Sequence, residues 1–313
     1  MRLNVDIIKN RQAIKLYVIL KKHFSHFTQP FVKKFIYVNK TAVMKKITLL
    51  ILIGFMINAC SSDDNKNNSS DYREYITKNS NVSAINFMPE EVYPAINASQ
   101  PPVLKLKLIT EDQFPCINYG LSTTQFAKGN ELVVRFDKIT ESGGCFTAIG
   151  PAISYIDLPE NTDKITFING DKIDQYSIDI NAQKISITLI EKHFTTSLYN
   201  KTFRIPANSF AYLCGTNKNN TQIYTDFYAL IKQNPDFTEY EFEGEGRKPY
   251  PETTSGNWVN HTTRFFKYHD AQEFNKLATI LNNYSAKNIE KNSGVSISIY
   301  GWNNIKFLSW IEN

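Results

Sequence analysis

The stretch from residue 164 to residue 190 most constrains the fold of this chain. It holds three short runs of alternating or apolar residues, Lys164–Ile168, Lys172–Ile180 and Lys184–Ile190. Asn169-Gly170 separates the first two runs, and this dipeptide is a strong signal for a two-residue hairpin turn, since both residues tolerate positive φ. A second polar turn at 181–183 precedes the third run. The stretch therefore predicts three successive antiparallel strands.

Similar short runs precede this stretch, at Val103–Ile109, Glu131–Ile139 and Ala152–Leu158. In Val103–Ile109 the alternation places Lys105 and Lys107 on the solvent face. About seven strands over residues 81–190 predict an immunoglobulin-like β-sandwich. The Cys…Trp…Cys spacing of true immunoglobulin domains is missing, so membership of that family is not expected.

The pattern changes over residues 191–313, for which we expect a smaller α+β domain of antiparallel strands and one long helix. Asp270 is the expected N-cap of the helix, with Glu273 completing a capping box. The apolar face of the helix is Phe274, Leu277, Ala278, Leu281, Tyr284 and Ile289. The expected strands are Thr202–Ile205, Gln222–Lys232, Trp258–Tyr268, Val295–Tyr300 and Ile305–Ile311. Overall the chain is predicted to be mainly β.

An export signal begins at Met44. Lys45 and Lys46 precede the uncharged apolar run Ile47–Ile57, which has the length of a signal-peptide core and is too short to span a bilayer. The run closes with Ile57-Asn58-Ala59-Cys60, which resembles the lipobox of bacterial lipoproteins. The resemblance implies that residues 44–59 are removed and that Cys60 carries acyl chains, typically palmitate, that anchor the protein to a membrane.

Ser61-Ser62-Asp63-Asp64 resembles the acidic export signal of surface lipoproteins of Bacteroidota. This resemblance implies an outer-membrane location facing the cell exterior. Residues 60–80 are rich in Asp, Asn and Ser, a composition typical of a disordered tether.

Residues 1–43 are basic, with interleaved aromatic side chains, and alone they would suggest an amphipathic or nucleic-acid-binding arm. Because a lipoprotein signal starts with only a few residues, we expect translation to begin at Met44 and the upstream segment to be a misassigned extension. Residues 1–46 hold eleven of the 35 Lys and Arg and one of the 30 Asp and Glu, so the chain from Cys60 onward keeps 24 basic and 29 acidic residues, a net charge of −5. This charge argues against a nucleic-acid partner.

Three cysteines follow Cys60. Cys116 and Cys145 both flank expected strands and are the favoured disulfide pair in an exported protein. Cys214 is either a buried thiol or an alternative partner. Their spacing matches no metal or redox motif, and we expect no metal and no cofactor.

No sequence motif of a common enzyme class is present, and no catalytic residue is predicted. The one local constellation is His261, His269 and Glu273, which could share a metal if they converge. The alternative is that Glu273 belongs to the capping box alone. A hydrolase of an envelope or extracellular polymer is accordingly the second hypothesis.

Aromatic residues suggest a different function. Trp258, Tyr300 and Trp302 lie near Asn and Gly residues, and such sets can stack on sugars while amides bind hydroxyls. The alternative is that they are core residues, as we expect for Trp310 between Leu308 and Ile311. The leading hypothesis is a non-enzymatic surface module that binds a glycan or a protein, with oligomeric state undetermined.

Overall fold

The computed structural model describes residues 71–311, except positions 79, 81, 97, 142, 145–147, 253 and 255. The predicted extension, the signal peptide, Cys60 and Cys145 lie outside the described residues, so the hypotheses about them stay predictions. Residues 67–313 belong to one compact unit. Among the described helices, none has the length and apolar character needed to cross a membrane.

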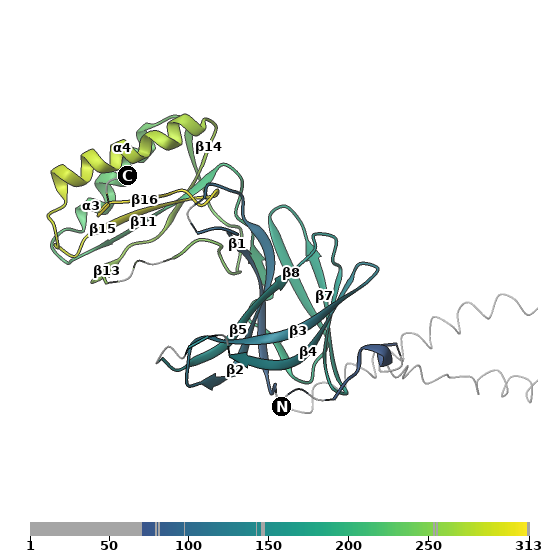
Figure 1. Cartoon of the computed structure of the whole chain (residues 1–313). Helices are drawn as coiled ribbons and strands as arrows, with labels where there is room; N and C mark the ends of the chain where they lie inside the picture. The colour runs from purple at the N-terminus through teal and green to yellow at the C-terminus, as the bar shows by residue number, and fades with distance from the viewer. Residues whose placement is uncertain are drawn as a thin grey trace, which may run out of the picture. The chain divides into compact units, whose positions relative to one another are not determined.

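The described chain is mainly β and contains three sheets (Figure 1). The first sheet has the order β5-β2-β1-β9, the second β10-β8-β7-β6-β4-β3, and the third β12-β14-β11-β15-β16, with β13 also paired to β11. The strands of the first sheet are β1 (Ile85–Val92), β2 (Val103–Phe114), β5 (Gly150–Asp157) and β9 (Thr195–Ser197). Those of the second are β3 (Tyr119–Lys128), β4 (Glu131–Glu141), β6 (Lys164–Asn169), β7 (Lys172–Ile180), β8 (Lys184–Glu191) and β10 (Lys201–Phe203). Those of the third are β11 (Ser209–Thr216), β12 (Phe237–Tyr240), β13 (Val259–Asn260), β14 (Arg264–Tyr268), β15 (Ser296–Gly301) and β16 (Lys306–Leu308).

The three-stranded meander predicted from residues 164–190 is confirmed as β6, β7 and β8. Asn169 pairs with Lys172 at the first hairpin, so Gly170 and Asp171 are the two central residues of the turn. Gly170 has a φ of 63°, whereas Asp171 is not among the described residues with positive φ. The turn therefore has the type II′ pattern, and the type I′ turn expected from Asn169-Gly170 is wrong in type and is displaced by one residue. The runs at 103–109, 131–139 and 152–158 also form strands. The predicted strands did not include β1 and β3, whose sequences carry no clear alternation.

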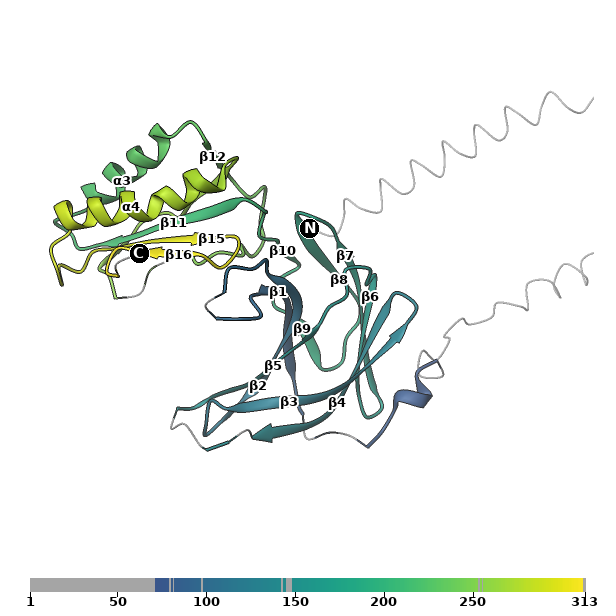
Figure 2. The ribbon, with the colours of Figure 1, turned by 45° about the horizontal axis from the view of Figure 1, so that its top comes forward.

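Side chains of the first and second sheets form one apolar core, and Figure 2 shows that the two sheets curl. Phe87 of β1 packs against Phe167 of β6 and Tyr176 of β7, with ring centroids 4.7 and 4.8 Å apart. At one side the sheets meet through Ser154, whose hydroxyl accepts from Leu121 N at 2.7 Å and donates to Leu121 O at 2.9 Å. These hydrogen bonds satisfy backbone groups where β3 of the second sheet meets β5 of the first.

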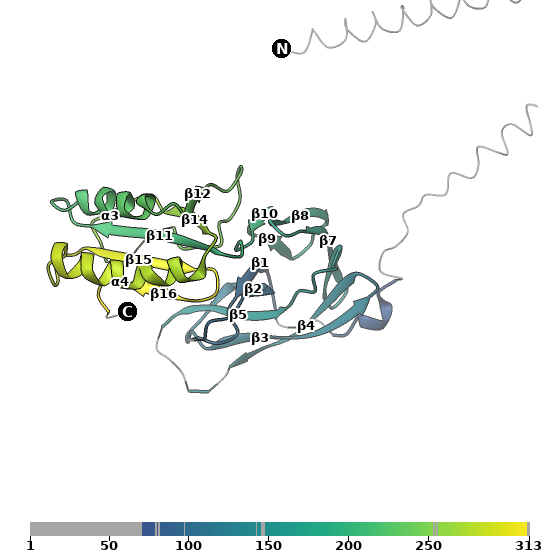
Figure 3. The same ribbon diagram turned by 90° about the horizontal axis from the view of Figure 1, so that it is seen from above.

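The third sheet has its own core, because two helices cover one of its faces (Figures 2 and 3). These are α3 (Gln222–Gln233) and α4 (Ala271–Asn288). The strand predicted for 222–232 is therefore wrong. Ile223, Phe227 and Ile231 are buried at a spacing of four residues, the spacing of a helix face.

The long helix α4 agrees with its predicted apolar face. Phe274, Leu277 and Leu281 are buried, and the Asp270 side chain caps the helix by accepting from Gln272 N. The second half of the predicted capping box is wrong. Glu273 instead accepts from Asn234 Nδ2 and pairs with Lys276, while Asp270 N donates to the Asp236 carboxylate at 2.9 Å.

Part of the predicted tether packs on the second sheet. A 3₁₀ turn, η2, spans Arg73–Tyr75, and Tyr72 is only 3% exposed. The Tyr72 hydroxyl donates to the Glu131 carboxylate at 2.7 Å, and its ring lies in a small cluster with Val133 and Ile168. Packed structure thus begins at Tyr72 or earlier, at least nine residues before the domain boundary expected at residue 81.

Candidate binding site

A depression of about 490 Å³ lies on the helix-free face of the third sheet. Its floor is made by β11 and β15, whose side chains alternate between the two faces. Cys214, Ile297 and Ile299 face the helices, so Leu213 and Ser298 face the depression. The described lining residues are Leu213, Thr254, Gly256, Asn257, Gly294, Val295, Ser296, Ser298, Tyr300 and Trp310.

Gly215 of β11 allows the segment before β13 to lie directly on the sheet. A Cβ atom at this position would overlap the Thr254 hydroxyl and the Asn257 side chain. Asn257 is fixed there, because its Nδ2 donates to Gly294 O at 2.8 Å and its Oδ1 accepts from the Ser296 hydroxyl at 2.9 Å. The rim of the depression is therefore held by side-chain hydrogen bonds to β15 and the turn before it.

The chemistry of the depression is aromatic and polar. Tyr300 is half-buried on its floor, with Lys306 Nζ 5.8 Å from the ring centroid. Trp310 lines its side and is 58% exposed, so the expectation that Trp310 is a core residue is wrong. Among the described lining residues none is charged. Such a surface favours a ligand that is uncharged and has both apolar and hydroxyl groups.

The three aromatic candidates from the sequence occupy different environments. Trp258 is 80% exposed and directly follows Asn257 of the rim, and Tyr300 lines the depression. Trp302 packs partly buried against the helix-covered core, and its Nε1 donates to the Tyr268 hydroxyl at 2.8 Å. Trp310, Asn257 and Ser298 were not predicted as site residues. Of these three, only Asn257 had a local signal, because it directly precedes Trp258.

The turn at 301–304 that contains Trp302 connects the third sheet to the loop between β1 and β2. Asn304 Nδ2 donates to the carbonyls of Ala95, Ile96 and Ala98 at 2.9–3.2 Å. The Tyr93 hydroxyl donates to Trp302 O at 2.9 Å. We call these contacts the clasp. They give the Asn-rich turn a structural role that the sequence did not indicate.

The residues of the metal hypothesis do not form one group. His261 lies before β14, where its ring stacks on Tyr224 at a centroid distance of 4.5 Å and contacts the Thr216 hydroxyl. Desolvation lowers the pKa of His261 below its usual value. His269 lies after β14 beside Asp236, and Glu273 follows on α4. The two histidines thus stand at opposite ends of a five-residue strand.

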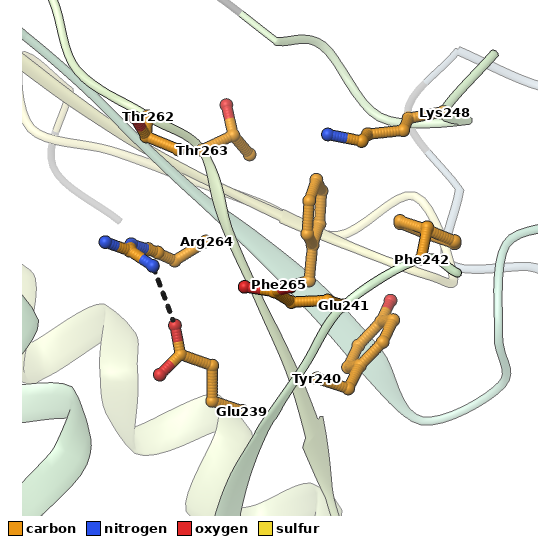
Figure 4. A pocket seen from close by; sticks show the side chains of 9 residues that line it. All are labelled: Glu239, Tyr240, Glu241, Phe242, Lys248, Thr262, Thr263, Arg264 and Phe265. Atoms are coloured by element: carbon orange, nitrogen blue, oxygen red, sulfur yellow. Dashed lines mark hydrogen bonds and ion pairs between the residues drawn. The ribbon is translucent and has the colours of Figure 1, made fainter. Parts of the chain in front are cut away.

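A second, smaller depression of about 160 Å³ lies where β12 ends beside the start of β14 (Figure 4). Tyr240, Phe242 and Phe265 form its apolar part, and Lys248 Nζ lies 5.6 Å from the Phe265 ring. Glu239 and Arg264 pair at 3.5 Å on its other side. Its size and its paired charges make it a less favourable ligand site than the depression on β11 and β15.

Two of the cysteines lie among the described residues. Cys116 is buried and disulfide-bonded, but Cys145 lies outside the described residues, so the Cys116–Cys145 pairing stays a prediction for peptide mapping under non-reducing conditions. Cys214 is a free, buried thiol. Burial raises the pKa of Cys214 to about 12, so the thiolate needed for reactivity is scarce at neutral pH.

Comparisons of the chain with protein-family models, with curated proteins and with solved structures found no match.

Proposed function

We propose that this chain is a surface-displayed binding module that holds a neutral glycan in the depression on β11 and β15. The observation that carries the proposal is the lining, in which Tyr300 and Trp310 stand beside Asn257, Ser296 and Ser298 and none of the described lining residues is charged. Its volume of about 490 Å³ falls in the range of small-molecule sites.

A glycan fits this lining for two physical reasons. The axial C–H groups of a sugar ring form an apolar face that can pack on an aromatic ring, while its hydroxyls need hydrogen-bond partners when they leave water. Acidic sugars fit less well, because a carboxylate or sulfate normally requires Arg or Lys in its binding site, and Lys306, which lies beside the Tyr300 ring, does not belong to the described lining. We therefore expect selection for uncharged sugars.

The test is calorimetric titration of residues 67–313 with a panel of neutral glucan, mannan, xylan and galactan oligosaccharides and of uronic-acid oligosaccharides. At least one neutral ligand should bind, and Trp310→Ala should weaken it about tenfold, the effect of removing one well-packed aromatic contact. Tyr199→Ala is the control, because Tyr199 is a similarly exposed aromatic residue that follows β9 of the first sheet. Binding of uronic-acid ligands alone would contradict the proposal.

The proposed location is the outer face of the outer membrane, through acyl chains on Cys60. Two or three acyl chains anchor a protein stably, because each buried methylene adds about 0.8 kcal/mol to membrane binding. Mass spectrometry of the native protein should find an acylated Cys60 and no peptide from residues 1–43. Cys60→Ala should move the folded protein to the soluble fraction, whereas membrane binding by residues 72–313 alone would contradict the lipid-anchor proposal.

For the fold we propose a modified immunoglobulin-like sandwich followed by an α+β domain with two helices instead of one. The adjacent order β1-β2-β5 supports the sandwich, since it matches neighbouring strands of one immunoglobulin sheet. Two parallel pairs, β1–β9 and β4–β6, distinguish it from that all-antiparallel arrangement. The third sheet, which two helices cover on one face, supports the α+β domain.

A further inference from the structure

A second groove adjoins the proposed glycan site, and Trp310 lines both. It has a volume of about 600 Å³ and lies between the C-terminal half of α4 and residues 309–311. Val295 and Trp310 line both this groove and the depression on β11 and β15. The two hollows therefore share a wall, and the exposed indole of Trp310 forms part of it. We call the second groove the α4 groove.

The lining of the α4 groove combines apolar and polar groups in the same way as the first hollow. Ala286, Ile289, Val295 and Trp310 supply apolar surface. Asn282, Asn292 and Ser309 supply amides and a hydroxyl, and the two charged residues, Glu290 and Lys291, have opposite signs. The groove consequently carries no net charge that would select a charged ligand.

Ser285 gives a second, independent observation that points to a ligand. It lines the α4 groove and is 8% exposed, and its hydroxyl has no hydrogen-bond partner within the part of the chain that the structure describes. A buried hydroxyl without a partner is destabilising, because it has left water without gaining a hydrogen bond in the protein. A ligand hydroxyl that enters the groove could provide the missing hydrogen bond after rotation of the Ser285 side chain.

We infer that the ligand is a neutral polysaccharide chain, whose consecutive sugar units occupy both hollows and cross Trp310. This inference rests on the proposed glycan function and specifies the ligand as a polymer. One hollow alone would suit a single sugar or a chain end. Two adjoining hollows that share Trp310 and Val295, neither of which carries a net charge in its described lining, suit a continuous chain better.

The experiment measures affinity as a function of chain length for the neutral glycan that binds best, from the monosaccharide to long oligosaccharides. For the wild-type protein, the dissociation constant should be at least about tenfold lower for long oligosaccharides than for the shortest ligand that binds. The reason is that long oligosaccharides gain contacts in the α4 groove. Ala286→Trp should remove this gain and leave affinity for the short ligand unchanged, since Ala286 is an exposed groove residue outside the first hollow.

Asn283→Trp is the matched control, because Asn283 is exposed on the same helix and does not line the groove. Ser285→Ala provides an independent variant. It should lower affinity for long oligosaccharides several-fold while leaving the free energy of unfolding equal or higher, since an unpaired buried hydroxyl is removed. A purely structural role of Ser285 would instead lower stability and leave the length dependence intact.

The outcomes separate the two proposals. Equal affinity for short and long ligands, or an unchanged length gain in Ala286→Trp, would overturn the polymer inference and leave the glycan site standing. Failure of every neutral glycan to bind the unmodified protein would overturn both.

Discussion

Asp174 is a carboxylate whose side chain is completely buried, and it organises the loop between β8 and β9. Its Oδ2 accepts from Phe194 N at 3.0 Å and from both the amide and the hydroxyl of Thr195 at 2.6 Å. Its Oδ1 accepts from His193 N at 2.7 Å. Four donors converge on this one side chain, so its negative charge is compensated although it is removed from water.

Asp174→Asn should therefore lower the free energy of unfolding by roughly 3 kcal/mol, because the amide group places a donor where backbone donors already point. The measurement is urea unfolding followed by circular dichroism. Asp157→Asn is the control, since Asp157 is 79% exposed and pairs with Lys105 at the surface; its effect should stay within about 0.5 kcal/mol. Equal effects of the two substitutions would contradict the role given to Asp174.

The clasp between the turn at 301–304 and the loop at 95–98 depends mainly on the side chain of Asn304. Asn304 has a φ of 68°, a left-handed conformation that Gly also adopts without strain. Asn304→Gly thus keeps the turn and removes the three contacts with the loop at 95–98. It should reduce stability by about 1–2 kcal/mol and speed amide hydrogen exchange in residues 93–100. Asn208→Gly, at a φ of 54° and outside the clasp, should leave this exchange unchanged.

The sequence was informative where local chemistry dominates. The Asn-Gly turn and the alternating runs that became β6, β7 and β8 could be predicted, as could the apolar face of α4, because their periodicity and turn residues act over a few positions. For 222–232, residues such as Tyr224 and Tyr228 blur the spacing of Ile223, Phe227 and Ile231. Only the packing of this segment on the third sheet shows that Ile223, Phe227 and Ile231 form one face of a helix.

The candidate site was less predictable for a related reason. Ser298 and Leu213 come together only through the pairing of β11 with β15, and Gly215 matters only because a distant segment crosses it. Trp310 stands among apolar neighbours in sequence, which favours burial, but it follows the end of β16, beyond the helix-covered core. Such placements depend on topology and cannot be derived from the spacing of residues.

For the molecule as a whole, two adjacent residues of β1 link the cores. Glu91 accepts from Arg204 Nε at 2.9 Å and from Ile205 N, and its side chain is 5% exposed. Glu90 pairs with Arg247, whose backbone also bonds to Lys201 and Phe203. Together with the clasp, these contacts explain why residues 67–313 form one compact unit although they contain separate cores.

Alkaline pH should unfold this unit through three partly buried tyrosines. Desolvation raises the pKa of Tyr93, Tyr240 and Tyr284 to about 12 from an ordinary value of 10.0. Since the folded-state pKa is raised, the stabilisation from the neutral phenols is complete below pH 10 and is lost as pH rises toward 12. Tyrosinate absorbance and circular dichroism should change together in that range. Complete titration near pH 10 with the fold intact would contradict this prediction.

In the proposed lipid-anchored form, the burial of Tyr72 also limits the distance between the membrane and the folded part of the chain. Only eleven peptide steps separate Cys60 from Asp71, a reach of at most about 40 Å even when fully extended, which is close to the thickness of the bilayer. If the proposed lipid anchor and polysaccharide site are both correct, each copy binds only polymer that reaches the cell surface, and neighbouring copies can hold one long chain at several points. The overall affinity of such multivalent binding can exceed the affinity of a single site by a factor of about 10²–10⁴. Weak binding by each copy would then be sufficient. It would also let the polymer move from one copy to the next.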